Sequence, residues 1–378
     1  MMKKVLYIYG NLPAYRESFF TQLSSCLGQE DIEMKVLYGY ITNKQTKQAA
    51  AREYKTQKFE TKLNDLKILR LSRMMGLLDA VKEEKPDAVI FQFNQTNLSE
   101  WKVLRYCRKN HIPYAIWGCN YTRADLKGWL VKLRNIIYKY VYRHASVCIP
   151  YGSLYHDFLV NLGMPKNKVI TAQNSIDVES ISASVSERTI ESFSHKTTRV
   201  LYVGALAPQK RIESSIEAVA QLINEGEDLI YDIVGGGTQL EVLKDYLSAK
   251  PSKIRERIIL HGAKYGDELR YFFLHADVFF MPGTGGLGVN EAMAYGLPII
   301  STIGDETVVD LIDGNGYLLK NMGDSPEQVI CLRNFLALSA VDKLEMSKKS
   351  IDIILGKASL KNMVAKHVEA IKLLITDK

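Results

Sequence analysis

The chain has 378 residues, of which 47% are hydrophobic and 24% are charged. This length and composition are typical of a globular protein with two domains, and they exclude a disordered or collagen-like chain. None of the five cysteines belongs to a CxxC pair, which argues against a disulfide framework or a zinc site and favours a reducing compartment. They are Cys26, Cys107, Cys119, Cys148 and Cys331.

The net charge of +7 is unevenly distributed. Residues 1–195 hold 28 Lys and Arg against 18 Asp and Glu, a balance of +10, whereas residues 196–378 hold 21 against 24, a balance of −3. This asymmetry favours an anionic partner for the first half, either nucleic acid or an acidic membrane surface. Because no segment resembles a nucleic-acid recognition motif, we expect no nucleic-acid partner.

The N-terminus MMKKVLYIYGNLP has only six mainly apolar residues between its lysines and a turn, fewer than a signal peptide needs. No later run reaches the roughly 18 apolar residues of a membrane span. We therefore expect a cytoplasmic protein, either free of the membrane or resting peripherally on the inner face of the plasma membrane.

Short apolar runs, several ending in glycine, alternate with helical periods along the whole chain. This pattern predicts an α/β fold with two Rossmann-like, doubly wound domains built on parallel sheets. The first half contains KVLYIYG, MKVLYGY, AVIFQFN, YAIWGC, SVCIPYG and KVITAQN, and the second contains RVLYVGA, LIYDIVGGG, RIILHGA, DVFFMPG and LPIISTI.

The segment between the halves is rich in Ser and Thr and lacks a sustained apolar stripe. We predict a first domain over 1–180, a linker over 181–196 and a second domain over 197–355. Residues 356–378 form a plausible amphipathic helix that packs on either domain.

Ligands of open α/β sheets bind outside the carboxyl ends of the strands, and two such domains that face one another form a cleft. The segment GTGGLGVNE (283–291) follows a predicted strand, and its last residues enter a helix predicted over VNEAMAYGLP, which places Glu291 in the first turn of that helix. It would direct the free N–H groups of 286–289 at one spot, where a phosphate fits. Lys210 and Arg211 follow another strand and could neutralise that anion. A glycine-rich turn without a ligand and a solvated pair of cations remain the alternatives.

The order of these motifs favours a ligand. VGALAPQKR, VGGG, HG, PG…GLGVNEAMAYGLPII and DGNGYLL, which together span most of 198–320, closely resemble the C-terminal domain of glycosyltransferase family 4. These are retaining nucleotide-sugar enzymes of GT-B fold. LPAYRESFFTQL and NSID (174–177) are similar to that family's acceptor-side loop and to its turn at the domain junction.

The resemblance implies a set of donor-binding residues. Lys210 would contact the pyrophosphate and stabilise the leaving nucleotide, Glu291 would bind the ribose, and the amides of Gly286, Leu287 and Gly288 would surround the phosphate. His261–Tyr265 would flank the base. The full donor set is Gly204, Lys210, Arg211, Gly235, Lys264, Tyr265, Thr284, Gly286, Leu287, Gly288 and Glu291. On the acceptor side we expect Tyr15, Arg16, Asn120 and Arg123, with Lys210, Glu291 and Asn120 as the catalytic residues.

The sequence departs from the family's pattern at three positions. Ala205 replaces an arginine, Cys119 replaces a histidine, and Gly283 replaces the glutamate that meets the donor sugar. Sugar recognition would then fall to Thr284 and to main-chain N–H groups. Cys119 would equally suit an ordinary buried thiol.

The expected function is retaining hexosyl transfer from a nucleotide diphosphate sugar to a glycan or lipid-linked glycan acceptor, in bacterial surface polysaccharide synthesis. The chain has no DxD-like acidic pair at a strand end, so we expect no metal and no cofactor. A sugar-nucleotide epimerase of the same fold and a non-catalytic nucleotide-sugar-binding protein are the alternatives. KGWLVKLRNIIYKYVYR (127–143) could lie on an anionic membrane, or it could be a surface helix packed on its domain.

Overall fold

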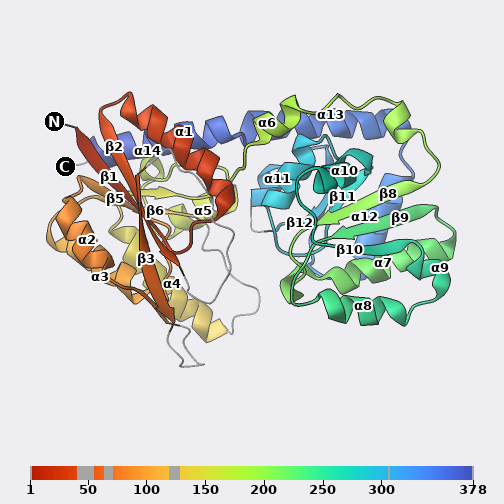
Figure 1. Cartoon of the computed structure of the whole chain (residues 1–378), viewed down its shortest axis with the longest axis horizontal. Coiled ribbons are helices and arrows are strands. Elements are labelled where there is room, and N and C mark those ends of the chain that lie inside the picture. The colour runs from red at the N-terminus through yellow and green to blue at the C-terminus, as the bar shows by residue number, and fades with distance from the viewer. Residues whose placement is uncertain (1, 41–54, 64–70, 119–127, 305–306, 377–378) are drawn as a thin grey trace. The chain divides into compact units, whose positions relative to one another are not determined.

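The structure is a computed structural model that describes residues 2–40, 55–63, 71–118, 128–304 and 307–376. The chain divides into two compact units. Unit 1 comprises residues 1–176 and 361–378, and unit 2 comprises residues 177–360. Each unit has its own sheet with helices on both faces, which is the Rossmann-like arrangement that the sequence predicts (Figure 1).

Unit 1 contains a seven-stranded sheet of order β4-β3-β2-β1-β5-β6-β7, parallel except for the β3–β4 pair. Its strands are β1 (Lys3–Tyr9), β2 (Ile32–Tyr40), β3 (Lys55–Leu63), β4 (Ser72–Met74), β5 (Ala88–Phe91), β6 (Tyr114–Trp117) and β7 (Val147–Ile149). Its helices are α1 (Glu17–Gly28), α2 (Leu77–Glu84), α3 (Leu98–Lys109), α4 (Gly128–Arg143), α5 (Ser153–Asn161) and α14 (Leu360–Thr376), with a 3-10 turn at Ala14–Arg16.

Alternation along β1 assigns the helices of unit 1 to its two faces. Leu6 and Ile8 belong to a core cluster that also includes buried residues of α2, α3, α4 and α5. Tyr7 and Tyr9 point to the other face, where they meet Phe20 of α1 and Trp117. Both faces of this sheet are therefore covered, as a parallel sheet requires.

Helix α14 belongs to unit 1, although it lies at the opposite end of the sequence. Its fully buried His367 is hydrogen-bonded through Nδ1 to the Tyr7 hydroxyl at 2.8 Å and packs edge-on against Trp117. Burial and the nearby Arg16 guanidinium lower the pKa of His367, so the imidazole is neutral. The chain thus leaves unit 1 after Ile176 and returns to it with α14.

Unit 2 contains a six-stranded parallel sheet of order β10-β9-β8-β11-β12-β13, the 3-2-1-4-5-6 arrangement of a dinucleotide-binding domain. Its strands are β8 (Thr198–Val203), β9 (Leu229–Val234), β10 (Ile258–Gly262), β11 (Val278–Met281), β12 (Ile299–Thr302) and β13 (Gly316–Leu319). Its helices are α6 (Val178–Ala183), α7 (Ile212–Glu225), α8 (Leu240–Ser248), α9 (Ser252–Arg255), α10 (Asp267–His275), α11 (Leu287–Ala294), α12 (Ser325–Leu336) and α13 (Ala340–Lys357).

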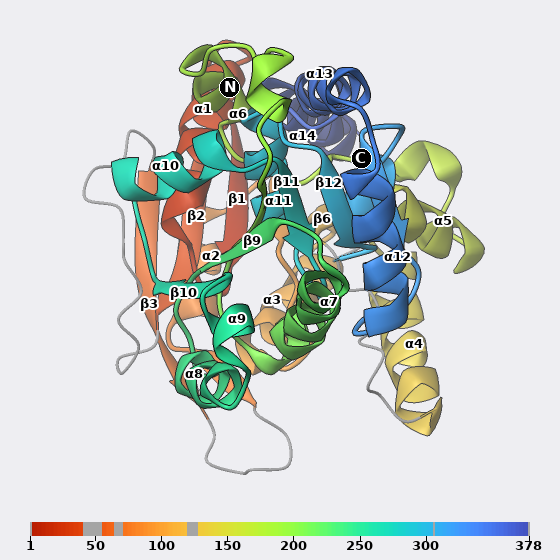
Figure 2. The ribbon, with the colours of Figure 1, turned by 90° about the vertical axis from the view of Figure 1, so that its right-hand side faces the viewer.

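Local chemistry fixes where several of these helices begin and end. Asp324 caps α12 by accepting from the Glu327 N–H, and Ser339 begins α13 with a capping box completed by Asp342. Gly226, with φ 105°, ends α7 in the left-handed conformation that glycine tolerates. Helices α7 and α12 pack side by side on one part of the unit (Figure 2).

The structure differs from the sequence-based expectations in two segments. KVITAQN forms an isolated bridge from Val169 to Cys148 instead of a strand. The predicted linker 181–196 is packed on unit 2 because Arg188 donates hydrogen bonds to the carbonyls of Phe273, Ala276 and Tyr295. The change of unit therefore falls at 176–177, before the Ser- and Thr-rich segment rather than within it.

Candidate functional site

The candidate site of unit 2 lies at the carboxyl ends of β8 and β11. These neighbouring strands are the point where the strand order reverses, because the chain continues from β8 to one side of the sheet and from β11 to the other. A crevice forms at such a switch point, and it is where doubly wound sheets bind ligands. Lys210 follows β8, and the glycine-rich segment 283–288 follows β11.

Lys210 ends a 3-10 turn, Pro208–Lys210, that lies against the segment after β11. Its half-buried ammonium donates a hydrogen bond to the Thr284 carbonyl at 2.5 Å, and the Thr284 N–H donates to the Gln209 carbonyl at 3.0 Å. The Thr284 hydroxyl also donates to Gln209. These contacts place the ammonium of Lys210 beside the glycines that lead into α11.

Gly283 is a glycine because the Lys210 turn packs directly on it. A Cβ atom at this position would lie 2.5 Å from the Gln209 carbonyl oxygen and from both carbonyl atoms of Lys210. Those contacts are with backbone, which cannot move as a flexible side chain can. The glutamate of the family pattern therefore does not fit at 283 with the Lys210 turn in this position.

The first turn of α11 presents main-chain N–H groups. The helix begins at Leu287, earlier than the sequence predicts, and the N–H groups of Val289 and Asn290 donate to the Gly286 carbonyl. Among the described residues, no acceptor is found for the N–H groups of Gly286, Leu287 and Gly288. Three amides, rather than the four expected over 286–289, are thus available to an anion at the positive end of the helix dipole.

Glu291 is the fifth residue of α11, a full turn from the N-terminus, so the sequence-based placement in the first turn is wrong. Its half-buried carboxyl group receives no hydrogen bond from a described residue, and burial raises its pKa to about 7. A carboxylate that is partly removed from water and lacks a donor is suited to accept hydrogen bonds from a ligand.

The glycines after β8 and β9 serve close packing between neighbouring loops. A Cβ atom at Gly235 would lie 1.9 Å from the Gly204 carbonyl oxygen, and one at Gly237 would lie 2.3 Å from that of Leu206. The Gly204 N–H donates to Val234, and the Gly235 N–H donates to Gly262. A tight connection thus accounts for Gly204 and Gly235 without a ligand.

Three other predicted donor residues lie at the same end of the sheet. Lys264 pairs with Glu268 at 3.2 Å, whereas Tyr265 is 64% exposed after β10. Arg211 is exposed and adopts the left-handed conformation, with φ 53°, at the start of α7. His261 is oriented by a 2.7 Å contact between its Nε2 and Asp232, which also pairs with Arg199.

In unit 1, the predicted acceptor residues Tyr15 and Arg16 differ in accessibility. Tyr15 is 46% exposed, but the Arg16 side chain is only 1% exposed. The Arg16 guanidinium donates to the Asn174 side chain at 2.5 Å, to the Ser175 carbonyl and to the Tyr151 hydroxyl. Because the Arg16 side chain is buried, we do not expect it to contact the acceptor directly. Asn120, Arg123 and Cys119 lie outside the described residues.

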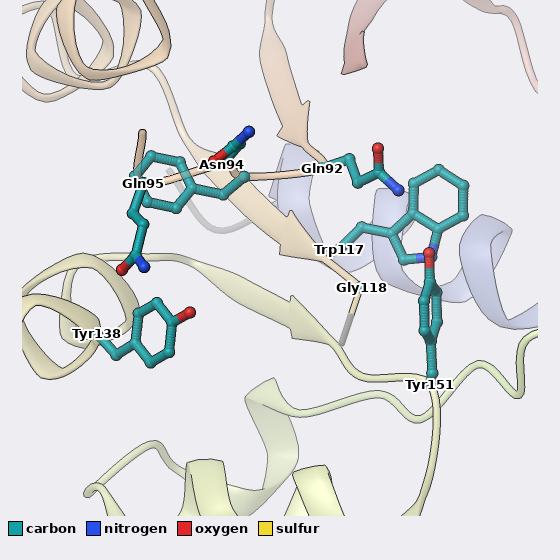
Figure 3. Close-up of a pocket in the computed structure, with 8 residues that line it drawn as sticks. Gln92, Asn94, Gln95, Trp117, Gly118, Tyr138 and Tyr151 are labelled. Carbon is teal, nitrogen blue, oxygen red and sulfur yellow. The ribbon is translucent and has the colours of Figure 1, made fainter. Parts of the chain in front are cut away.

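Sequence reasoning missed a pocket of about 270 Å³ at the carboxyl end of the unit 1 sheet. Figure 3 shows amide side chains along the segment that follows β5, Trp117 and Tyr151 at the ends of neighbouring strands, and Tyr138 projecting from α4. The lining residues are Gln92, Phe93, Asn94, Gln95, Trp117, Gly118, Tyr138 and Tyr151. The signal in the sequence was FQFNQ, which places amides directly after a buried strand.

A buried carboxyl group holds the amide segment of this pocket. Glu100 of α3 is fully buried and accepts from the Asn94 N–H at 2.7 Å and from the Asn97 side chain at 2.8 Å. Burial raises the pKa of Glu100 to about 8. Gln92 is fixed from the other side, where its side-chain N–H donates to the Tyr9 hydroxyl at 2.9 Å. Aromatic rings with oriented amides form a surface suited to an uncharged, hydroxyl-rich ligand.

The part of the chain that the structure describes contains neither a membrane-spanning helix nor a cluster of metal ligands. None of its helices is long and apolar enough to cross a membrane. The same ranges contain no group of three or more His, Cys, Asp and Glu side chains that could hold a metal ion.

The fold defines a class of α/β protein with two units, each built on a largely parallel sheet. Residues 186–345 match the family model described as glycosyl transferases group 1. The chain is also similar in fold to Anabaena Alr3699/HepE, solved with UDP (TM-score 0.71, 14% identity) and with UDP-glucose (TM-score 0.69, 13% identity). The UDP-bound match covers 98% of this chain and 100% of that chain. The predicted GT-B class, with two Rossmann-like domains, is confirmed.

Two curated proteins resemble part of the sequence. A putative colanic acid biosynthesis glycosyltransferase of Escherichia coli, WcaL, is 24% identical over 193 residues, 48% of this chain and 46% of that protein. The GtfA subunit of a UDP-N-acetylglucosamine–peptide N-acetylglucosaminyltransferase of Streptococcus pneumoniae is 28% identical over 154 residues, 39% of this chain and 29% of that protein. The alignments span less than half the length of either relative.

Proposed function

We propose that the protein is a glycosyltransferase that moves a sugar from a nucleotide diphosphate sugar to a glycan or lipid-linked glycan acceptor. One observation carries this proposal: the Lys210 ammonium is hydrogen-bonded to the Thr284 carbonyl, just before the amides of 286–288 at the switch point of unit 2. A cation and a helix N-terminus together fit a diphosphate. Both lie within the residues that match the glycosyl transferase model.

The reaction makes use of charge that develops on the leaving group. As the bond between the sugar C1 and the phosphate oxygen breaks, negative charge grows on the nucleotide diphosphate, and Lys210 with the α11 amides would stabilise it. The acceptor oxygen forms the new bond to C1, and its proton passes to the leaving phosphate. We propose transfer with retention, in which attack and departure occur on the same face of the sugar.

The switch-point site of unit 2 and the pocket of unit 1 would hold the two different substrates. UDP compounds are the first donors to test, because HepE was solved with UDP and with UDP-glucose. Glu291 would accept hydrogen bonds from the ribose hydroxyls. The amide and aromatic pocket around Gln92 and Trp117 would hold the acceptor sugar. We propose this pocket, in place of Arg16, as the acceptor contact. A similarity to WcaL supports surface polysaccharide synthesis as the setting.

Product analysis with a panel of UDP-sugars tests the proposal. Release of UDP that depends on an added glycan or lipid-linked acceptor, with the sugar found on that acceptor, is the expected result. Conversion of the donor sugar without acceptor would identify an epimerase instead, and donor binding with no turnover on any acceptor would contradict catalysis. Because we propose no metal or cofactor, the transfer is expected to persist in the presence of a chelator.

The raised pKa of Glu291 predicts a pH dependence of nucleotide binding. Its value in the folded chain, about 7, lies above the ordinary value of 4.5. The folded state therefore binds this proton more tightly, and its contribution to stability falls as pH rises from about 4.5 to about 7. A ribose diol donates to the ionised carboxylate, so UDP affinity should rise as pH rises through about 7.

Calorimetry with UDP at several pH values, on the wild-type chain and on Glu291→Gln, measures this effect. The titration of UDP itself affects its binding to both proteins equally, so its effect cancels in the ratio of wild-type to variant affinity. We expect that ratio to increase between about pH 6 and pH 8. A ratio that is constant over this range would show that the Glu291 carboxylate does not contact the nucleotide.

A further inference from the structure

Helix α3 presents a purely cationic outer surface. Lys102, Arg105 and Lys109 are exposed at helical spacing, with Arg108 partly exposed beside them. The only carboxyl group of this helix, Glu100, is fully buried and is used to hold the pocket segment. The exposed surface of α3 therefore carries no negative charge.

Helix α4 repeats the pattern and adds apolar groups. Lys132, Lys139 and Arg143 are exposed, and the sequence of the helix contains no Asp or Glu. Ile136, 67% exposed, and Tyr140, 49% exposed, lie on the same stripe as these cations. Transfer of these two side chains from water into an apolar phase would be favourable.

The two helices form one continuous surface. The Arg108 guanidinium donates a hydrogen bond to the Tyr140 hydroxyl and lies 4.9 Å from the centre of that ring. We call the exposed residues of α3 and α4 the basic face. The flanking helices differ from the basic face in charge, because they carry exposed acids: Asp79 and Glu83 in α2 and Asp157 in α5.

We propose that the basic face binds the surface of an anionic lipid bilayer. Seven cations without exposed acids provide electrostatic attraction to anionic headgroups. Ile136 and Tyr140 provide a shallow apolar insertion, as in helices that lie in the plane of a membrane. A nucleic acid would use the charges but would leave Ile136 in water.

The position of α4 connects this surface to the pocket of unit 1. On its inner side, Tyr138 is 5% exposed and lines the pocket, while Val141 and Tyr142 are buried in the core. One helix thus carries the bilayer contact on its outer side and part of the pocket wall on its inner side. This link, which rests on the proposed function, favours a lipid-linked acceptor.

Vesicle co-sedimentation of the full chain, without nucleotide or acceptor, tests the proposal independently of transferase activity. The chain is expected to bind vesicles of phosphatidylcholine with about 30% phosphatidylglycerol, not phosphatidylcholine alone. The binding should weaken between about 0.1 M and 0.5 M salt. Equal binding to both kinds of vesicle, or binding to RNA with none to either vesicle, would overturn it.

Charge reversal locates the binding surface. The variant Lys132→Glu/Lys139→Glu/Arg143→Glu should lower the partition coefficient at least about tenfold, because each cation near an anionic surface contributes about fivefold. A matched control reverses three exposed lysines of unit 2, Lys244, Lys253 and Lys348, and should bind like the wild type. Equal losses in both variants would overturn the proposal. Ile136→Ser should weaken binding without changing its salt dependence, and unaltered binding would exclude apolar insertion.

Discussion

Replacing Lys210 by methionine is expected to lower kcat/KM for sugar transfer by about a hundredfold, because one preorganised charge at the leaving group is removed. Methionine keeps much of the length and packing of the lysine stem, so the change is mainly in charge. The Lys210→Arg variant keeps the charge but alters its position, and it should retain intermediate activity. Initial rates of acceptor-dependent UDP release measure both variants.

Lys253→Met is the matched control, since this lysine is exposed on the same unit and belongs to no proposed site. It should have wild-type activity and an unchanged melting temperature. Near-wild-type turnover of Lys210→Met would contradict the placement of the diphosphate between β8 and β11. A loss of activity that is matched by loss of folded protein would assign Lys210 to structure instead of catalysis.

The second large effect is expected at Gly283. The variant Gly283→Glu introduces the residue that the resembled family has at this position, and we nevertheless expect it to lower the rate of transfer by about a hundredfold. The added Cβ would meet the backbone of Gln209 and Lys210 at 2.5 Å, so the Lys210 turn must move away. Misplacement of a reacting or charge-stabilising group by about 1 Å can lower the rate of a reaction about a hundredfold. Gly283→Ala should show nearly the same loss, because the first carbon is already in conflict.

Gly356→Ala serves as the control for glycine replacement. Gly356 lies in α13, and a Cβ there would meet nothing within 4 Å. This substitution should preserve activity and slightly raise the melting temperature, since alanine favours helix more than glycine does. Higher transfer by Gly283→Glu than by wild type would show that the turn is positioned differently in the working enzyme.

The sequence predicted the architecture well because buried parallel strands are continuous apolar runs. Ten of the eleven predicted runs are strands. Strand β3, which pairs with β2 and β4, was missed because KTQKFETKL is largely polar, with only Phe59 among its described apolar side chains in the core. KVITAQN was overpredicted because an apolar run is also found in a buried segment beside a sheet, where Val169 makes its single bridge.

The site was less predictable because residue type does not reveal where a side chain points. Lys210 and the α11 amides come together at the switch point, which strand order implies. Arg16 is a cation in the 3-10 turn that follows a strand, as Lys210 is, but it is buried among Tyr9, Trp117 and Tyr151. The amides of the unit 1 pocket were missed because the wall of that pocket combines segments that follow three different strands. Only the order of the strands in the folded sheet shows that these segments are neighbours.

The contacts of Arg16 tie together the two segments at which the chain leaves unit 1 and returns to it. Its guanidinium holds Asn174 and Ser175, just before the chain enters unit 2, and also contacts the Met363 sulfur, just after the chain returns. Within unit 2, Glu179 accepts a hydrogen bond from the Leu360 N–H at 3.1 Å and so joins the two passages. The chain therefore passes between the units at Ile176–Val178 and at the start of α14, and both sides of each passage are held by contacts within their own unit.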